Sequence, residues 1–89
     1  MSVNKLLIQI ERKLILPKQI KAARALLGLN QDELAKAAGI GSATLKRVEA
    51  TDQIRGAAGT IWKIEQALEA AGIEFIPAGA GKGPGVRLA

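Results

Sequence analysis

Two short helices separated by a turn of only three residues are the feature that most restricts how this chain can fold. Asn30 and Glu33 have the spacing of a capping box, in which Asn30 caps a helix and Glu33 reaches back to the backbone N–H of Asn30. Gly39 suits the positive φ angle at which such a helix ends. After the turn, the pattern predicts a further helix from about Ser42 to Glu49.

The side chains of this segment meet the packing needs of such a helix pair. Ala35 lies four residues before Gly39, where the helices cross closely and a small side chain is needed. The positions that must face inward are all apolar: Leu34, Ala38, Ile40, Leu45 and Val48. Spacing and packing together predict a helix-turn-helix, the geometry that places a second helix in the major groove of DNA.

Two more helices are expected around this pair, which makes the fold class mainly α. One runs from Pro17 to about Leu27 and ends at Gly28. The other runs from about Thr60 to Ala71 and ends at Gly72. Their inner positions are Ile20, Ala23 and Leu27 in the first, and Ile61, Ile64, Leu68 and Ala71 in the second.

Both ends of the chain alternate with the period of a strand. Most even positions over residues 5–16 are apolar, which predicts an N-terminal strand. Residues 73–76 and 86–88 alternate on either side of a glycine-rich segment, which predicts a short β-hairpin. The expected organisation is therefore an N-terminal segment 1–16, a candidate dimer element; a DNA-binding domain 17–72; and a hairpin tail 73–89.

Composition narrows the function classes. Thirteen basic residues against eight acidic ones give a net charge of +5, which favours a polyanionic partner and above all nucleic acid. The chain has no cysteine and no histidine, so it has no disulfide and no zinc site of the usual ligands. The sequence also shows no combination of a nucleophile and a general base that would indicate a catalytic site. An enzyme, a metal and a cofactor are not expected, and the polar N-terminus predicts a cytoplasmic protein without a signal peptide or membrane span.

The motifs resemble the lambda repressor/Cro-like (XRE-type) family of DNA-binding proteins. The likeness rests on residues 28–35, on Gly39-Ile40 and on residues 44–49, and it covers about Lys18 to Ala71. It implies a four-helix lambda repressor-like domain that regulates transcription. Gly41 departs from the family, which often has Ser or Thr capping the third helix, and the N-terminal segment is not part of the family's common core.

Helical geometry indicates which side chains face DNA. If Leu45 and Val48 point inward, steps of about 100° place four side chains outward, with Ser42 and Thr44 at the flanks. Those four are Ala43, Lys46, Arg47 and Ala50. Arg47 can bind guanine at two points, Ala43 can touch a thymine methyl, Ser42 can reach a base edge or a phosphate, and Lys46 is expected to meet phosphate. The alternative is a solvated helix face without a DNA role.

Two residues outside that helix are further candidates for DNA binding. Gln31 opens its helix, where free N–H groups and the helix dipole favour a phosphate. Arg55 is a phosphate candidate, and Gln53 is a weaker one. The family resemblance adds a backbone contact for Gln31 and base-facing roles for Ser42, Ala43 and Arg47.

Three other side chains are interpreted as structural or as subunit contacts. By resemblance, Arg24 and Glu49 form an ion pair that links the first helix of the domain to the end of the third. Trp62 lies beside the inner positions of its helix rather than among them. It is therefore interpreted as an edge of the core or as a contact with another subunit, and base stacking is the least favoured alternative.

The sequence thus predicts a sequence-specific transcriptional regulator of double-stranded DNA. We expect a homodimer on a palindromic operator, with the strands at the two chain ends as dimer material. One alternative is an antitoxin that also autoregulates and binds a small toxin partner. Another is a protein-interaction or co-activator module that does not read sequence.

Overall fold

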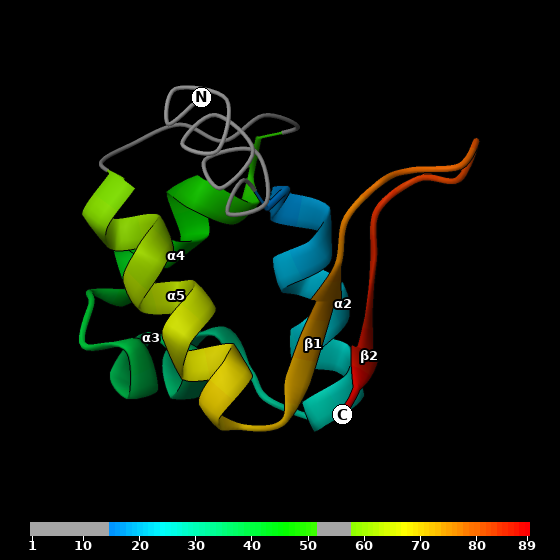
Figure 1. Ribbon diagram of the computed structural model, residues 1–89. Helices are drawn as coiled ribbons and strands as arrows, with labels where there is room; N and C mark the ends of the chain where they lie inside the picture. The colour runs from blue at the N-terminus through cyan, green and yellow to red at the C-terminus, as the bar shows by residue number, and fades with distance from the viewer. Residues whose placement is uncertain (1–14, 52–57) are drawn as a thin grey trace, which may run out of the picture.

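The computed structural model describes residues 15–51 and 58–89. Over these ranges the chain forms four helices, followed by a two-stranded antiparallel hairpin (Figure 1). The elements are α2 (Pro17–Leu27), α3 (Gln31–Ala38), α4 (Ser42–Glu49), α5 (Ala58–Ala70), β1 (Ile73–Ile76) and β2 (Gly85–Leu88). The mainly α fold with a C-terminal hairpin is therefore confirmed. Almost all of the strand predicted over residues 5–16 lies outside the described residues and stays a prediction.

Local chemistry explains where the first helix begins. Leu16 is extended, with φ −93° and ψ 151°, as expected for a residue that precedes proline. Pro17 then occupies the first turn, where a missing N–H costs nothing. The side chain of Gln19 accepts a hydrogen bond from the backbone N–H of Leu16 at 2.7 Å, which satisfies a donor at the helix start.

The predicted capping box at the start of α3 is confirmed. The Glu33 backbone N–H donates to Asn30 Oδ1 at 2.7 Å, and the Asn30 backbone N–H donates to Glu33 Oε1 at 2.9 Å. Gly39 ends the helix with φ 71°, in the left-handed region that favours glycine. Gly41 precedes α4 without a side-chain cap, as the departure from the family pattern predicts.

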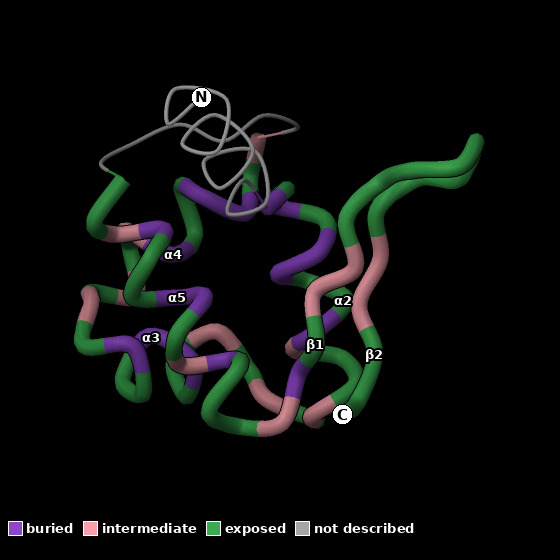
Figure 2. Tube along the Cα trace, in the orientation of Figure 1, coloured by how far each residue is buried: buried purple, intermediate pink, exposed green. Residues whose placement is uncertain are grey.

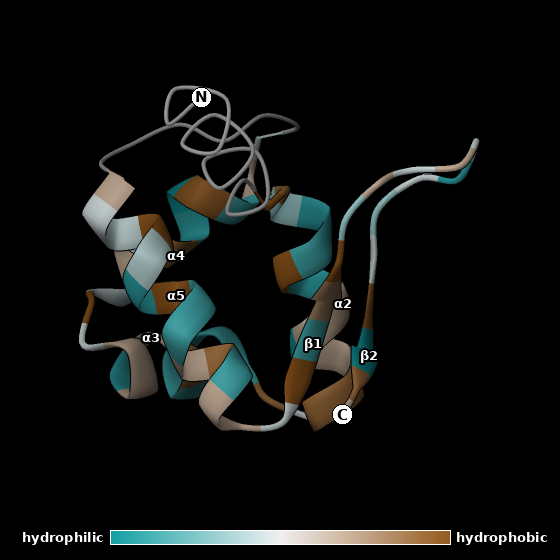
Figure 3. Ribbon diagram, in the orientation of Figure 1, coloured by the Kyte–Doolittle hydropathy of each residue, from teal (hydrophilic) through white to brown (hydrophobic). Residues whose placement is uncertain are grey.

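Side chains from all four helices and from β1 meet in one core. Figures 2 and 3 show that the buried, apolar stretches of the helices face one another around this interior. The buried apolar residues are Ile15, Ile20, Ala23, Leu34, Ala35, Ala38, Leu45, Val48, Ile61, Ile64, Leu68 and Ile73.

The prediction that Ala71 belongs to the inner face of α5 is wrong. Helix α5 ends at Ala70, and Gly72 turns the chain with φ 102°. This turn leaves Ala71 exposed and brings Ile73, which is 3% exposed, into the core instead. The α5 helix also begins two residues earlier than predicted, at Ala58 rather than Thr60.

The far end of the hairpin, residues 77–84, projects beyond the helices as an exposed arm (Figures 1 and 2). Its pairing runs from Ile73 opposite Leu88 to a bridge between Gly79 and Lys82, whose backbones exchange hydrogen bonds of 2.9 Å in both directions. Ala80 and Gly81 lie between them with φ 53° and 76°. Two successive positive φ angles in a two-residue loop define a type I′ turn, whose twist matches that of the strands.

The base of the hairpin is fixed to the helices. Phe75 and Val86 pack against the core, and the Gln19 side chain donates a hydrogen bond from Nε2 to the carbonyl oxygen of Gly85 at 3.0 Å. Gln19 is buried, so its amide connects the start of α2 to the start of β2 away from water. In the described ranges, no helix combines the length and the apolar character needed to cross a membrane.

Candidate nucleic-acid interface

Helix α4 presents one polar face to solvent. Leu45 and Val48 are 0% and 5% exposed, so they anchor the opposite side of the helix in the core. Ala43, Lys46 and Arg47 are exposed. The outward positions predicted from the helical period are therefore confirmed, and Ser42 and Thr44 are half-buried at the flanks of that face.

A hydrogen bond across the turn joins this face to the helix before it. The Ser42 hydroxyl donates to Asp32 Oδ1 at 2.6 Å. Asp32 is exposed in the first turn of α3, and Ser42 is the first residue of α4. Asp32 was not among the residues predicted from the sequence. No helical period relates positions on two different helices, so the sequence pattern carried no signal for this contact.

Glu49 holds the end of α4 against two other helices. It is 2% exposed, and its carboxylate accepts hydrogen bonds from Nε and Nη2 of Arg24, both at 2.8 Å. Arg24 Nη1 also donates to the carbonyl oxygen of Leu29 at 3.1 Å. The hydrogen bond with Glu49 is the main cause that raises the pKa of Arg24 above its usual value. The ion pair implied by the family resemblance is therefore present.

Residues 20–73 match the model of a helix-turn-helix family, HTH_3, and this match spans more than half of the 89-residue chain. The chain belongs to the XRE-type helix-turn-helix family. No curated protein matches it. The family comprises DNA-binding transcription regulators and is not an enzyme family, so this protein is a DNA-binding transcription regulator.

Gln31 opens α3, as predicted, and its side chain has a partner that the sequence did not indicate. This XRE-family chain directs its Gln31 side chain inward, where Nε2 donates to Glu49 Oε1 at 3.0 Å. The side chain is thus half-buried and held by the same carboxylate as Arg24. Its backbone N–H remains at the start of α3, so the predicted phosphate contact depends on the backbone rather than on a free amide.

The described residues bring together most, but not all, of the predicted DNA-binding set. Arg47 lies along the surface of α4, where Nη2 approaches Thr44 Oγ1 at 3.4 Å. Lys46 and Ala43 share that exposed face. Arg55, the phosphate candidate beyond α4, and the weaker candidate Gln53 lie outside the described residues, so their roles stay predictions.

Proposed function

We propose that this regulator reads a specific DNA sequence through the exposed face of α4. The observation that carries the proposal is the arrangement of Ala43, Lys46 and Arg47 on a helix whose other side is anchored in the core. Arg47 has the reach and the planar donors to bind guanine at two points, and the small Ala43 side chain permits close approach to a base edge. Lys46 supplies charge for the phosphate backbone.

The contacts of α4 with α2 and α3 support this role, because a reading helix must be held rigidly. Glu49 connects α4 to Arg24 of α2 and to Gln31 of α3. The Ser42–Asp32 hydrogen bond holds the other end of α4 to α3. Because both ends of α4 are fixed, the helix loses little conformational freedom when its side chains contact base edges.

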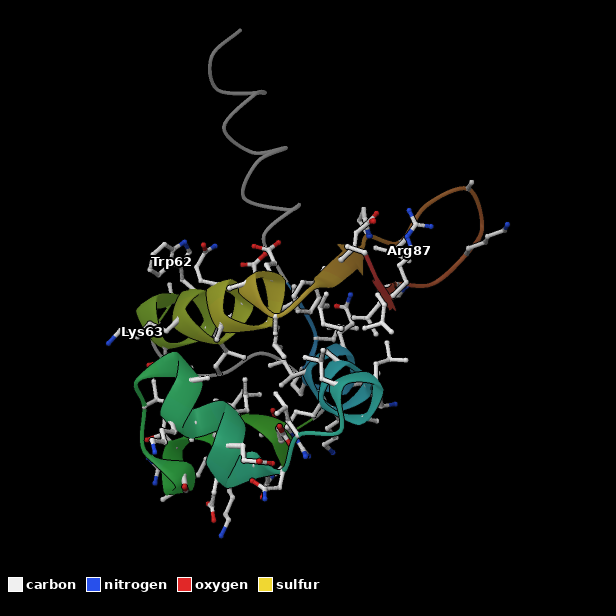
Figure 4. All side chains as sticks on the ribbon, turned by 90° about the horizontal axis from the view of Figure 1, so that it is seen from below. Trp62, Lys63 and Arg87 are labelled. Carbon is white, nitrogen blue, oxygen red and sulfur yellow. The ribbon has the colours of Figure 1, made fainter. Side chains whose placement is uncertain are left out.

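We further propose that the protein acts as a homodimer on a palindromic operator. One unit of this size reads only a few base pairs, and a two-fold dimer doubles the site. Trp62 supports a dimer because it is 51% exposed, on the side of α5 turned away from α3 (Figure 4). Tryptophan is enriched in the centres of protein interfaces. We also propose that the protein acts in the cytoplasm, where a transcription regulator meets its DNA.

Selection of bound duplexes from a random library tests these proposals together. We expect a recurring motif with two inverted half-sites, separated by about one helical turn of 10–10.5 base pairs or a multiple of it. Binding that depends on salt but selects no motif would contradict sequence reading and indicate the alternative of an interaction module. Purification of the chain with a small protein partner from its own cells would indicate the antitoxin alternative.

A further inference from the structure

The hydrogen bond between Ser42 and Asp32 fixes the direction in which Ser42 can bond. A serine hydroxyl carries one hydrogen and two lone pairs, whereas an aspartate carboxylate carries lone pairs only. The 2.6 Å separation between Ser42 Oγ and Asp32 Oδ1 is typical of a strong hydrogen bond from a hydroxyl to a charged oxygen. The hydrogen of Ser42 is therefore committed to Asp32, and the pair presents only acceptors to its surroundings.

This acceptor pair lies at the end of α4 that begins the DNA-facing surface. Asp32 is exposed and Ser42 is half-buried, so the pair is at the surface rather than in the core. The capping box of α3 is completed by Asn30 and Glu33, so Asp32 is not needed for it. Asp32 therefore acts on the next helix rather than on its own cap.

The major groove contains groups that such a pair distinguishes. Adenine N6 and cytosine N4 carry amino groups that donate hydrogen bonds, whereas guanine O6 and thymine O4 only accept. A pair that only accepts hydrogen bonds attracts the amino groups of adenine and cytosine and repels the carbonyl oxygens of guanine and thymine. The negative charge of Asp32 also disfavours a phosphate at this point, which favours a base contact for Ser42 over a phosphate contact.

We propose that Asp32 sets the specificity of Ser42, so that the pair selects an amino base, adenine or cytosine, on the strand that it faces. Asp32 is a positioning residue in this role, because it acts through the orientation of the Ser42 hydroxyl. The inference rests on the proposed function, since it requires that α4 reads base edges.

The test compares variants on duplexes that carry the selected site. First, the base pair that Ser42 faces is identified as the one whose preference disappears in Ser42→Ala. All four base pairs are then placed there, and dissociation constants are measured by fluorescence anisotropy for wild type, Asp32→Ala and Asp32→Asn. Glu69→Gln is the matched control, because it removes one exposed negative charge from α5, away from α4. Circular dichroism checks that each variant is folded.

We expect wild type and Glu69→Gln to bind adenine or cytosine at that position about three- to tenfold more tightly than guanine or thymine, the range for one net hydrogen bond. In Asp32→Ala the freed hydroxyl rotates to donate or accept, so the four base pairs should bind within about twofold of one another. Asp32→Asn should weaken the preference, because its amide can either accept from Ser42 through Oδ1 or donate to it through Nδ2.

Two results would overturn the inference alone: an unchanged preference in both Asp32 variants, or a wild-type preference for guanine or thymine at the position that depends on Ser42. A wild type without any preferred sequence would instead overturn the proposed function, and the inference with it. The two failures are therefore distinguishable within one set of measurements.

Discussion

Arg24 and Glu49 form a two-point ion pair, in which Nε and Nη2 of the guanidinium each lie 2.8 Å from a different oxygen of the carboxylate. The two partners differ in exposure, since the Arg24 side chain is 20% exposed and that of Glu49 only 2%. Gln31 donates to the same carboxylate from the start of α3. One buried group thus positions three helices, and its charge depends on Arg24 for compensation.

Removing Arg24 should therefore destabilise the domain strongly. Arg24→Met leaves the buried Glu49 carboxylate without its cation, and we expect the free energy of unfolding to fall by about 2 to 4 kcal/mol. Urea denaturation followed by circular dichroism measures the change. The double variant with Arg24→Met and Glu49→Leu should recover part of the loss, because two apolar side chains replace a buried ion pair without leaving a charge unpaired.

The pair between Arg87 and Glu74 on the hairpin is the matched control. Its Nη2–Oε2 distance is also 2.8 Å, but the two side chains are 64% and 48% exposed. Solvent screens such a pair, so Arg87→Met should leave the urea midpoint unchanged within error. Equal losses in Arg24→Met and Arg87→Met would contradict the view that burial makes the Arg24 pair important.

Arg47 and Lys46 should have different effects on DNA binding. Arg47→Ala removes the proposed base contact, so we expect a loss of about 1 to 3 kcal/mol in affinity for the operator and relaxed preference at one base pair. Lys46→Ala removes the proposed phosphate contact, so affinity should fall about equally for operator and random duplexes, with a decrease of about 1 in the salt slope.

Titrations of both variants at several salt concentrations check this difference. Lys63→Ala is the control, because Lys63 is an exposed lysine on α5 rather than on α4 (Figure 4). It should retain operator binding close to that of wild type. If Arg47→Ala weakened binding to all sequences equally, the assignment of Arg47 as a base-reading residue would be wrong.

The turn of the hairpin contains an alanine in a backbone conformation that is unfavourable for alanine. Ala80 has a φ angle of 53°, whereas every other positive φ in the described residues belongs to glycine. An alanine in this region costs about 1 kcal/mol, and asparagine tolerates it better. Ala80→Asn should therefore stabilise the domain by about 0.5 to 1 kcal/mol and raise the melting temperature by about 3 to 6 °C.

Ala78→Asn provides the control for this prediction. Ala78 is also an exposed alanine of the hairpin, but its φ is not positive, so the same substitution relieves no strain there. Its melting temperature should stay close to that of wild type. A similar increase in both variants would show that the effect comes from the asparagine side chain rather than from the turn.

Local patterns allowed much of this fold to be predicted from the sequence. The capping box of Asn30 and Glu33, the positive φ of Gly39 and the outward face of α4 each depend on residues within one helix or its ends. The type I′ turn was not predicted, because Ala80 is not among the residues that usually adopt positive φ.

Contacts between helices account for most of what the sequence did not reveal. Asp32 meets Ser42 and Gln31 meets Glu49 only because α3 and α4 cross at a particular angle and distance. The Arg24–Glu49 pair was expected, but from a family resemblance rather than from spacing. Hydrogen bonds between side chains of different helices can therefore be identified only from the packed structure, since no helical period links the two positions.

The exposed Trp62 leads to a prediction about the dimer. A half-exposed tryptophan buries a large apolar area when it enters an interface, so its removal weakens association more than that of most residues. If α5 forms the dimer contact, Trp62→Ala should be a monomer at micromolar concentration by light scattering, while wild type is a dimer. The fold should be unaffected, because Trp62 lies outside the core.

The outer edge of β2 is the competing dimer surface, and one substitution separates the two. The Ala89 N–H donates a hydrogen bond to the Gly72 carbonyl oxygen at 2.7 Å. In an antiparallel ladder the N–H groups of successive residues point alternately towards and away from the partner strand, so the N–H of Leu88 points away from β1. Leu88→Pro therefore removes a donor from the free edge without breaking the hairpin ladder. If α5 forms the dimer contact, Leu88→Pro should remain a dimer. A monomeric Leu88→Pro together with a dimeric Trp62→Ala would place the dimer contact on the hairpin instead of α5.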